Sequence, residues 1–255
     1  MLWHARPMEW LGGVYPVREA LRARRRELRR LWLARGHGPT RQLLAGLAEQ
    51  AGLTVEWVSP EVLDQRLPPG ARGQGCALEA GPLPELDLKA LLDRPAADGR
   101  RVVALDRVED PRNLGAVARV AEATGSTALL LPGRHSAPLS PIASRASAGA
   151  LEHLPVCRVP NLARALDSLR EASFWVLGAE PEASEGLFDA PDRWFEGELA
   201  LVFGSEERGI RPGVARRLDH RLRIPMSGRV ASLNVASAAA VVLFEVVRRR
   251  REGGS

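Results

Sequence analysis

The second half of the chain alternates between short apolar runs and segments in which apolar residues recur at helical spacing. The apolar runs have the length and continuity of strands buried on both faces, and they cover residues 102–106, 127–131, 174–179 and 199–204. The helical segments between them cover residues 114–124, 142–150 and 162–171. This alternation predicts a doubly wound, mostly parallel sheet that binds ligands at the carboxyl ends of its strands.

The first half predicts a smaller α/β domain at residues 11–80, preceded by a loose tail at residues 1–10. Apolar residues fall on one helical face from Gly13 onward, but residues 28–34, with the sequence LRRLWLA, fit either a continued helix or a strand. The pattern alone leaves that choice open. The other expected elements are a helix at 43–51, a strand at 54–58, a helix capped by Ser59 with Pro60 in its first turn, and a strand at 73–80.

A linker and a second domain follow. Residues 81–100 carry prolines and acidic side chains around one short helical pattern, LKALLD, and are expected to connect the two domains. The second domain then covers residues 101–251. Its last four residues, the consecutive arginines 248–251, and the tail at 252–255 are expected to be solvated.

The charge balance is compatible with an RNA partner. The chain of 255 residues has a formal net charge of +5, and Lys89 is its only lysine. Guanidinium groups bind phosphate in a bidentate manner and stack on bases, although a GC-rich or heat-adapted genome would also replace lysine by arginine. The candidate RNA-binding residues are the arginines of the first basic run, Arg22, Arg25, Arg26, Arg29 and Arg30.

Several protein classes are not supported. No apolar run reaches the roughly eighteen residues of a membrane-spanning helix, and the N-terminus lacks a signal-peptide pattern, so we expect a cytoplasmic location. Cys76 and Cys157 are far apart and have no Cys or His at ligand spacing, which argues against a disulfide framework and a zinc site.

Three polar motifs follow predicted strands. In the first, Asn113 comes after a strand and Arg119 lies six residues further on, inside a predicted helix. Six residues are not a whole number of helical turns, so the two side chains do not share one helical stripe. They border one pocket if Asn113 belongs to the loop. The alternative is that Asn113 caps the helix and Arg119 is a surface charge.

The second motif, VFGSEERGI, places Gly204 at the end of a strand and Glu206 in the next loop, and a turn with solvated acids is the alternative. The third motif follows a strand that ends at Ile224. There, Ser232 is predicted to cap a small-residue helix that starts at Leu233, with Asn234 projecting towards a pocket. A capped core helix is the alternative for this motif.

Taken together and in this order, the three motifs resemble those of the SPOUT superfamily, and within it the TrmH-type RNA ribose 2′-O-methyltransferases. The segments WLGGVYPVREAL, RGQGCAL and ASAGALEHLPVCRVPNL extend the similarity to the bacterial 23S rRNA guanosine 2′-O-methyltransferase subgroup, over nearly the whole chain. The resemblance implies an RNA-binding first domain similar to ribosomal protein L30e. It also implies a second domain with a deep C-terminal trefoil knot, and a homodimer.

The resemblance further implies S-adenosyl-L-methionine as the cofactor, held by Gly204, Ile224, Met226 and Leu233, with no metal ion. A ribose 2′-hydroxyl would attack the methyl group of the sulfonium in line. Arg119 is proposed in the family as the base, but a guanidinium is a poor base, so it could instead fix the 3′ phosphate while a phosphate oxygen or water accepts the proton. The positioning residues would be Asn113, Glu206, Ser232 and Asn234.

Other assignments compete with these. His135 and His153 are alternative bases, and the sequence around His153 has a structural character. A tRNA ribose methyltransferase of the same family and a non-catalytic RNA-binding ribosome-assembly factor are the alternative functions. The first domain favours rRNA over tRNA, and the presence of Asn113, Arg119, Glu206 and Asn234 together favours an enzyme.

Overall fold

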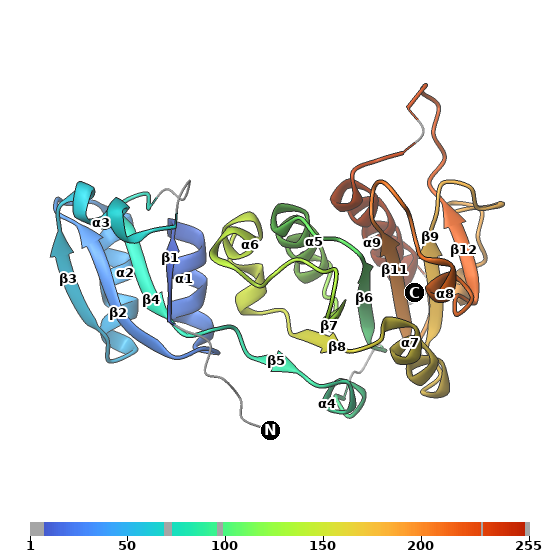
Figure 1. Ribbon diagram of the computed structural model, residues 1–255, viewed down its shortest axis with the longest axis horizontal. Coiled ribbons are helices and arrows are strands. Elements are labelled where there is room, and N and C mark those ends of the chain that lie inside the picture. Colours follow the sequence, from blue (N-terminus) through green and yellow to red (C-terminus); the bar gives the residue numbers. More distant parts are fainter. Residues whose placement is uncertain (1–7, 69–72, 96–98, 231, 253–255) are drawn as a thin grey trace.

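The computed structural model describes residues 8–68, 73–95, 99–230 and 232–252, and it shows two sheets lying one beyond the other along the length of the molecule (Figure 1). The N-terminal sheet has the strand order β1-β4-β2-β3, in which only β2 and β3 are parallel. Helices α1 and α2 pack on one face of it and α3 on the other. Its elements are β1 (Glu9–Gly12), α1 (Val14–Ala23), β2 (Leu28–Ala34), α2 (Pro39–Gln50), β3 (Thr54–Val58), α3 (Pro60–Arg66) and β4 (Cys76–Ala80).

Local signals account for much of this domain. The Ser59 hydroxyl accepts a hydrogen bond from the Val62 amide, and Pro60 is the first residue of α3, as predicted. The ambiguous segment 28–34 is strand β2. The expected tail is too long, because β1 begins at Glu9 and pairs with β4, and Trp10 packs against the ring of Trp32 at 4.7 Å. Residues 1–7 lie outside the described part of the chain.

The second sheet confirms the predicted mixed α/β architecture. All its strand pairs are parallel, in the order β10-β12-β9-β11-β6-β7-β8-β5. The strands are β5 (Glu85–Leu86), β6 (Arg101–Asp106), β7 (Ala128–Pro132), β8 (Val156–Val159), β9 (Trp175–Ala179), β10 (Glu185–Gly186), β11 (Leu199–Gly204) and β12 (His220–Arg223). The trefoil knot stays a prediction, since strand order does not trace how the chain threads.

Helices cover both faces of this sheet. One apolar cluster joins it to α5 (Pro111–Ala123), α6 (Pro141–Ala146) and α9 (Val235–Glu252). The other joins it to α4 (Leu88–Leu92), α7 (Leu162–Glu171) and α8 (Pro212–Ala215). The 3₁₀-helices are η1 (Ala150–Glu152) and η2 (Asp192–Trp194). Among the described helices, none has the length and apolar character needed to cross a membrane.

The segment expected to be a linker is part of the second domain. Within residues 81–100, β5 pairs with β8 at the sheet edge, and Leu91 of α4 is fully buried in the sheet's core. An edge strand of two residues is held by backbone hydrogen bonds and needs no apolar run, so the pattern did not reveal it. Strand β8 itself was also not predicted. Residues 96–98 lie outside the described residues.

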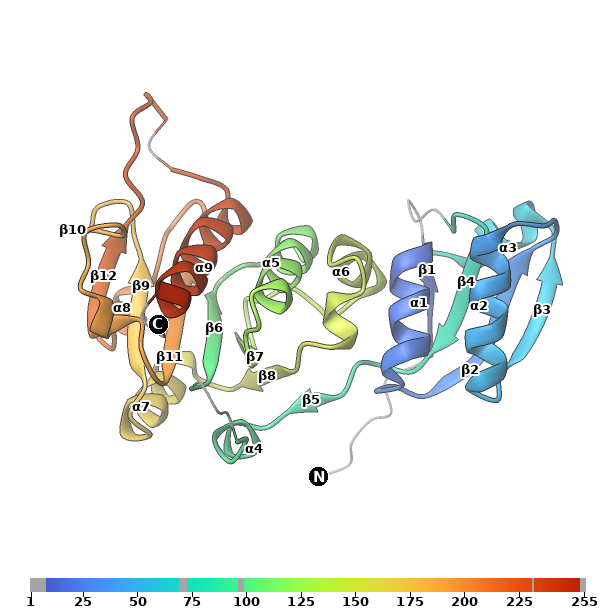
Figure 2. The same ribbon diagram turned by 180° about the vertical axis from the view of Figure 1, so that it is seen from behind.

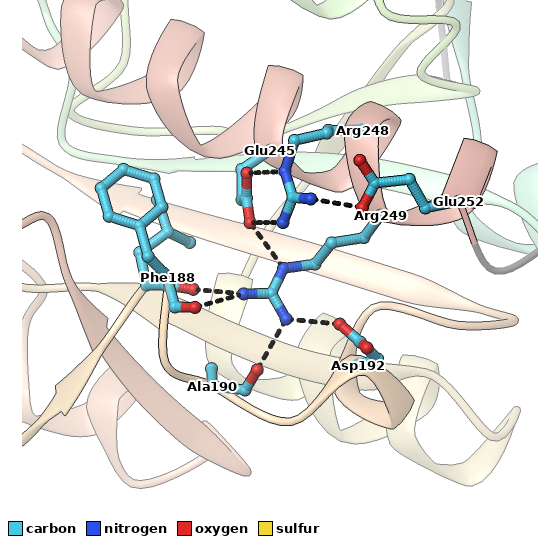
Figure 3. Close-up of polar contacts among 8 residues, drawn as sticks. Phe188, Ala190, Asp192, Glu245, Arg248, Arg249 and Glu252 are labelled. Atoms are coloured by element: carbon cyan, nitrogen blue, oxygen red, sulfur yellow. Dashed lines mark hydrogen bonds and ion pairs between the residues drawn. The ribbon is translucent and has the colours of Figure 1, made fainter.

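The C-terminal arginines are not uniformly solvated. Helix α9 continues to Glu252, and Arg249 is 8% exposed. Figure 3 shows its guanidinium inserted against the loop that follows β10. Its acceptors are Glu245, Asp192 and the carbonyl oxygens of Leu187, Phe188 and Ala190, at 2.6–3.0 Å. The end of α9 is therefore anchored to the sheet domain. Residues 253–255 are not described.

A buried ion pair joins the two domains. Arg26, just before β2, donates to both carboxylate oxygens of Glu152 in η1 at 3.0 and 2.9 Å, and both side chains are 0% exposed. The same guanidinium donates to Glu9 at 2.7 Å and to the Gly81 carbonyl oxygen at 3.1 Å. Burial raises the pKa of Glu152, and the charge of Arg26 opposes this shift. Figure 2 shows α6 beside α1 at this junction.

Candidate active site

The carboxyl ends of β9, β11 and β12 surround a cavity of about 360 Å³, which lies within the range of small-molecule sites. Its apolar wall comes from Leu222, Ile224, Met226 and Leu233. All four residues predicted to hold the cofactor line it, as do Glu206 and Ser232. The loop after β9 adds further residues that were not predicted, namely Glu180, Pro181 and Glu182.

The close approach of Gly204 to a neighbouring loop shapes this cavity. A Cβ atom at Gly204 would lie 2.1 Å from the carbonyl carbon of Gly209, so only glycine fits. The loop between them is held at its far side by Arg211, whose backbone amide and guanidinium donate to the buried carboxylate of Asp106 at 2.8 and 2.7 Å. The position of Glu206 within the loop is thereby fixed.

We expect Gly204→Ala to weaken binding of the predicted cofactor, S-adenosylmethionine, about 10- to 100-fold, because the displaced loop carries cavity-lining residues and overpacking costs about 1–3 kcal/mol. Isothermal titration calorimetry measures the affinity. The control is Gly213→Ala in α8, where an added Cβ meets nothing within 4 Å. Equal affinity in the two variants would contradict the proposed wall.

The structure brings together one polar residue from each of the three motifs. Asn113 donates from Nδ2 to Glu206 Oε1 at 2.9 Å, and Asn234 donates from Nδ2 to the same oxygen at 2.6 Å. Asn234 also donates to Asn113 Oδ1 at 3.0 Å. Glu206 rather than Glu207 makes these contacts. A hydrogen-bonded cluster of this kind fixes the orientation of each member.

Helix boundaries differ from the predicted ones at two of these positions. Helix α9 begins at Val235, and Asn234 caps it, because its Oδ1 accepts a hydrogen bond from Ala236 N at 3.0 Å. The prediction of Ser232 as the cap was wrong, since an asparagine two residues later supplies the same acceptor. Asn113 is neither loop nor cap: it lies in the first turn of α5, which is capped by Asp110.

Arg119 does not join this cluster. Its side chain is exposed on α5, it does not line the cavity described above, and it has no hydrogen bond or ion pair with the described residues. Of the two histidines, His153 donates a hydrogen bond from Nε2 to the carboxylate of Glu19 at 3.0 Å, at the junction of the domains. His135 lies beside Glu109 at 3.5 Å, on the other side of the polar cluster.

The predicted RNA-binding arginines have different environments. Arg26 is buried in the domain junction, so the prediction that it contacts RNA was wrong, and Arg25 donates to the Glu152 carbonyl oxygen at 3.2 Å. Arg29 is the most exposed of the run, with 61% of its side chain accessible, and it lies 3.6 Å from Glu79. Arg22 and Arg30 are partly exposed and pair with Glu19 and Glu79 respectively.

The cavity suits a cofactor that combines apolar and cationic parts. Its apolar wall can accommodate an aromatic ring, while Glu180, Glu182, Glu206 and Glu207 provide negative charge that favours a cation such as a sulfonium. Among the described residues, no group of three or more His, Cys, Asp or Glu side chains could hold a metal ion. Because the cavity has both an apolar wall and carboxylates, its residues fit S-adenosylmethionine.

Two family descriptions match the chain. The description "SpoU rRNA Methylase family" matches residues 100–244, more than half of the sequence. The chain belongs to this family. A second description, "RNA 2'-O ribose methyltransferase substrate binding", matches residues 10–86 of this SpoU methylase.

Relatives of this SpoU methylase extend over nearly its whole length. It is 34% identical to the putative TrmH family tRNA/rRNA methyltransferase YacO of Bacillus subtilis, over 96% of this chain and 98% of that protein. It is 37% identical to the 23S rRNA (guanosine-2'-O-)-methyltransferase RlmB of Pseudomonas aeruginosa, over 93% and 95% of the two chains.

A solved structure supports the cofactor. The SpoU methyltransferase AviRb from Streptomyces viridochromogenes, in complex with AdoMet, matches with a TM-score of 0.79 and 26% identity, over 96% of this chain and 91% of that chain. The SpoU methylase described here is thus an S-adenosylmethionine-dependent RNA 2′-O-methyltransferase, and the predicted family, enzyme class and cofactor are confirmed.

Proposed function

We propose that this enzyme methylates the ribose 2′-hydroxyl of a guanosine in 23S rRNA. The observation that carries the proposal is the hydrogen-bonded cluster of Asn113, Glu206 and Asn234 at the rim of the cofactor cavity. Asn234 and Glu206 also accept hydrogen bonds from the first amides of α9, but capping of that helix does not require Asn113 in the cluster. The relative from Pseudomonas aeruginosa, named for 23S rRNA guanosine, supports the choice of substrate.

The residues of the site would have three separate roles. Gly204, Ile224, Met226 and Leu233 hold the cofactor, which supplies a methyl group on a sulfonium when it is bound. The cluster of Asn113, Glu206 and Asn234, together with Ser232, orients the ribose. Arg119 either accepts the proton of the 2′-hydroxyl or binds the adjacent phosphate, and the second role suits a guanidinium better because this group is a strong hydrogen-bond donor and a poor base.

We also propose a homodimer that acts in the cytoplasm. Arg119 lies on the exposed side of α5, outside the cofactor cavity, and Phe244 on the neighbouring helix α9 is 54% exposed. A second copy that covers this surface would bury Phe244 and bring further side chains near the site. Size-exclusion chromatography with light scattering tests this state, and a monomer at micromolar concentration would contradict it.

Deletion of the gene is expected to remove one 2′-O-methylguanosine from 23S rRNA and to leave tRNA unchanged. Nuclease digestion followed by mass spectrometry of both RNA classes measures this. A loss confined to tRNA would favour the tRNA methyltransferase alternative. Unchanged methylation in both RNA classes, combined with no transfer of labelled methyl groups by the purified protein, would favour an assembly factor.

A further inference from the structure

A second cavity lies on the other side of the polar cluster. It has a volume of about 550 Å³ and is lined by the loops after β6 and β11, by Asn113 and by His135. It shares Ser205, Glu206, Glu207 and Val235 with the cofactor cavity. Glu206 and its asparagine partners therefore stand between two adjoining spaces, of which only the first has the apolar wall suited to the cofactor.

Arg107 is the unusual residue of this second cavity. Its backbone has a φ of 60°, in the left-handed region that favours glycine. Its Nε is buried without a hydrogen-bond partner, and within the described part of the chain its guanidinium makes no hydrogen bond or ion pair. Backbone strain and an unsatisfied buried donor both cost free energy. Arg107 lies beside the candidate active site and has both a strained backbone and an unsatisfied buried donor. A functional contact would account for these two unfavourable features.

The carboxylates that line this cavity do not pair with Arg107. Asp110 is occupied as the cap of α5, Glu109 lies beside His135, and Glu206 accepts hydrogen bonds from Asn113 and Asn234. Arg208 also lines the cavity, and its guanidinium likewise has no partner among the described residues. The lining therefore carries four carboxylates, Glu109, Asp110, Glu206 and Glu207, and two guanidinium groups without partners among the described residues, so an anion would be held by direct pairing with a guanidinium.

We propose that the second cavity receives the target nucleotide and that Arg107 binds a backbone phosphate of the RNA next to the target ribose. A guanidinium matches a phosphate with two parallel hydrogen bonds, and Arg208 adds positive charge at the same cavity. The inference rests on the proposed function in one respect, namely that RNA is the substrate. It adds a binding residue that lies in the loop between β6 and α5, apart from Arg119.

Arg107→Gly tests the proposal with little risk to folding, because glycine adopts the observed backbone conformation without strain. The probe is an unmodified 23S rRNA transcript, and its affinity is measured by filter binding at several salt concentrations. We expect a five- to tenfold weaker affinity, a rise of similar size in KM for RNA, and an unchanged affinity for S-adenosylmethionine. The slope of log affinity against log salt should become shallower by about 0.7–0.9, which corresponds to one lost phosphate contact.

The matched control is Arg164→Ala, which removes an arginine exposed on α7, on the opposite face of the sheet. It is expected to leave the RNA affinity, the salt slope and turnover unchanged. Thermal unfolding of both variants verifies that they fold.

Two outcomes overturn the proposal. One is an Arg107→Gly variant with the RNA affinity and salt slope of the control. The other is a weaker affinity with an unchanged slope and a loss confined to RNAs with one particular target base, which would make Arg107 a base contact. Failure of the proposed function can be distinguished from failure of the Arg107 proposal. In that case the enzyme without any substitution would not transfer methyl groups to the transcript.

Discussion

Replacing Arg119 by alanine is expected to abolish methyl transfer to RNA while S-adenosylmethionine binds with near-normal affinity. The side chain lies on the exposed side of α5 and outside the cofactor cavity, so its removal leaves that cavity intact. Loss of a group that accepts the proton or stabilises the attacking oxygen lowers turnover by about 10²–10⁴-fold. Single-turnover transfer of labelled methyl groups to 23S rRNA measures the loss, and calorimetry measures the cofactor affinity.

Arg119→Lys separates the two roles considered for this residue. A lysine keeps the positive charge but loses the bidentate fork, so a phosphate-binding role predicts a higher KM for RNA with part of the turnover retained. A base role predicts a changed dependence of turnover on pH, because an amine loses its proton at a lower pH than a guanidinium. An Arg119→Ala variant that kept most of its activity would contradict both roles.

Arg26→Ala is expected to lower the free energy of unfolding by about 3–5 kcal/mol, because it leaves the carboxylate of Glu152 buried without its countercharge. Both side chains are 0% exposed, and the same guanidinium also binds Glu9 and the Gly81 carbonyl oxygen. Urea denaturation followed by circular dichroism measures the change. Limited proteolysis should cleave the variant faster between the two domains.

Arg29→Ala is the matched control from the same basic run. Its side chain is 61% exposed, so its removal should change stability little. If the exposed arginines of this domain contact RNA, Arg29→Ala should weaken RNA binding with a shallower salt dependence, whereas Arg26→Ala should not at temperatures where it is folded. A stable Arg26→Ala variant with weakened RNA binding would reverse this assignment.

The central strands and the polar cluster could be predicted from local pattern. Gly204, Glu206 and Asn234 each follow a predicted apolar strand, and the loops at the carboxyl ends of parallel strands meet at one edge of a sheet. The same rule, applied to the strand that ends at Ala179, would have found Glu180 and its neighbours in the cavity wall.

Other features depend on contacts between distant segments. Arg26 looks like any other arginine of its run, and its partner Glu152 lies 126 positions away along the chain. The pairing of β5 with β8 and the burial of Arg249 against the loop after β10 likewise leave no local pattern. The left-handed backbone of Arg107 could not be predicted from the sequence, because arginine is not a residue type that favours this conformation.

The buried contact of Arg26 with Glu152 has a consequence for how a substrate is chosen. Since the two domains are joined through a buried ion pair, we expect the exposed arginines of the first domain to stay at a set distance from the cofactor cavity. An RNA that occupies both places must hold its target ribose at that same separation from a second contact point. If the RNA contacts both places, we expect its tertiary shape, more than the bases that flank the target, to decide which nucleotide is modified.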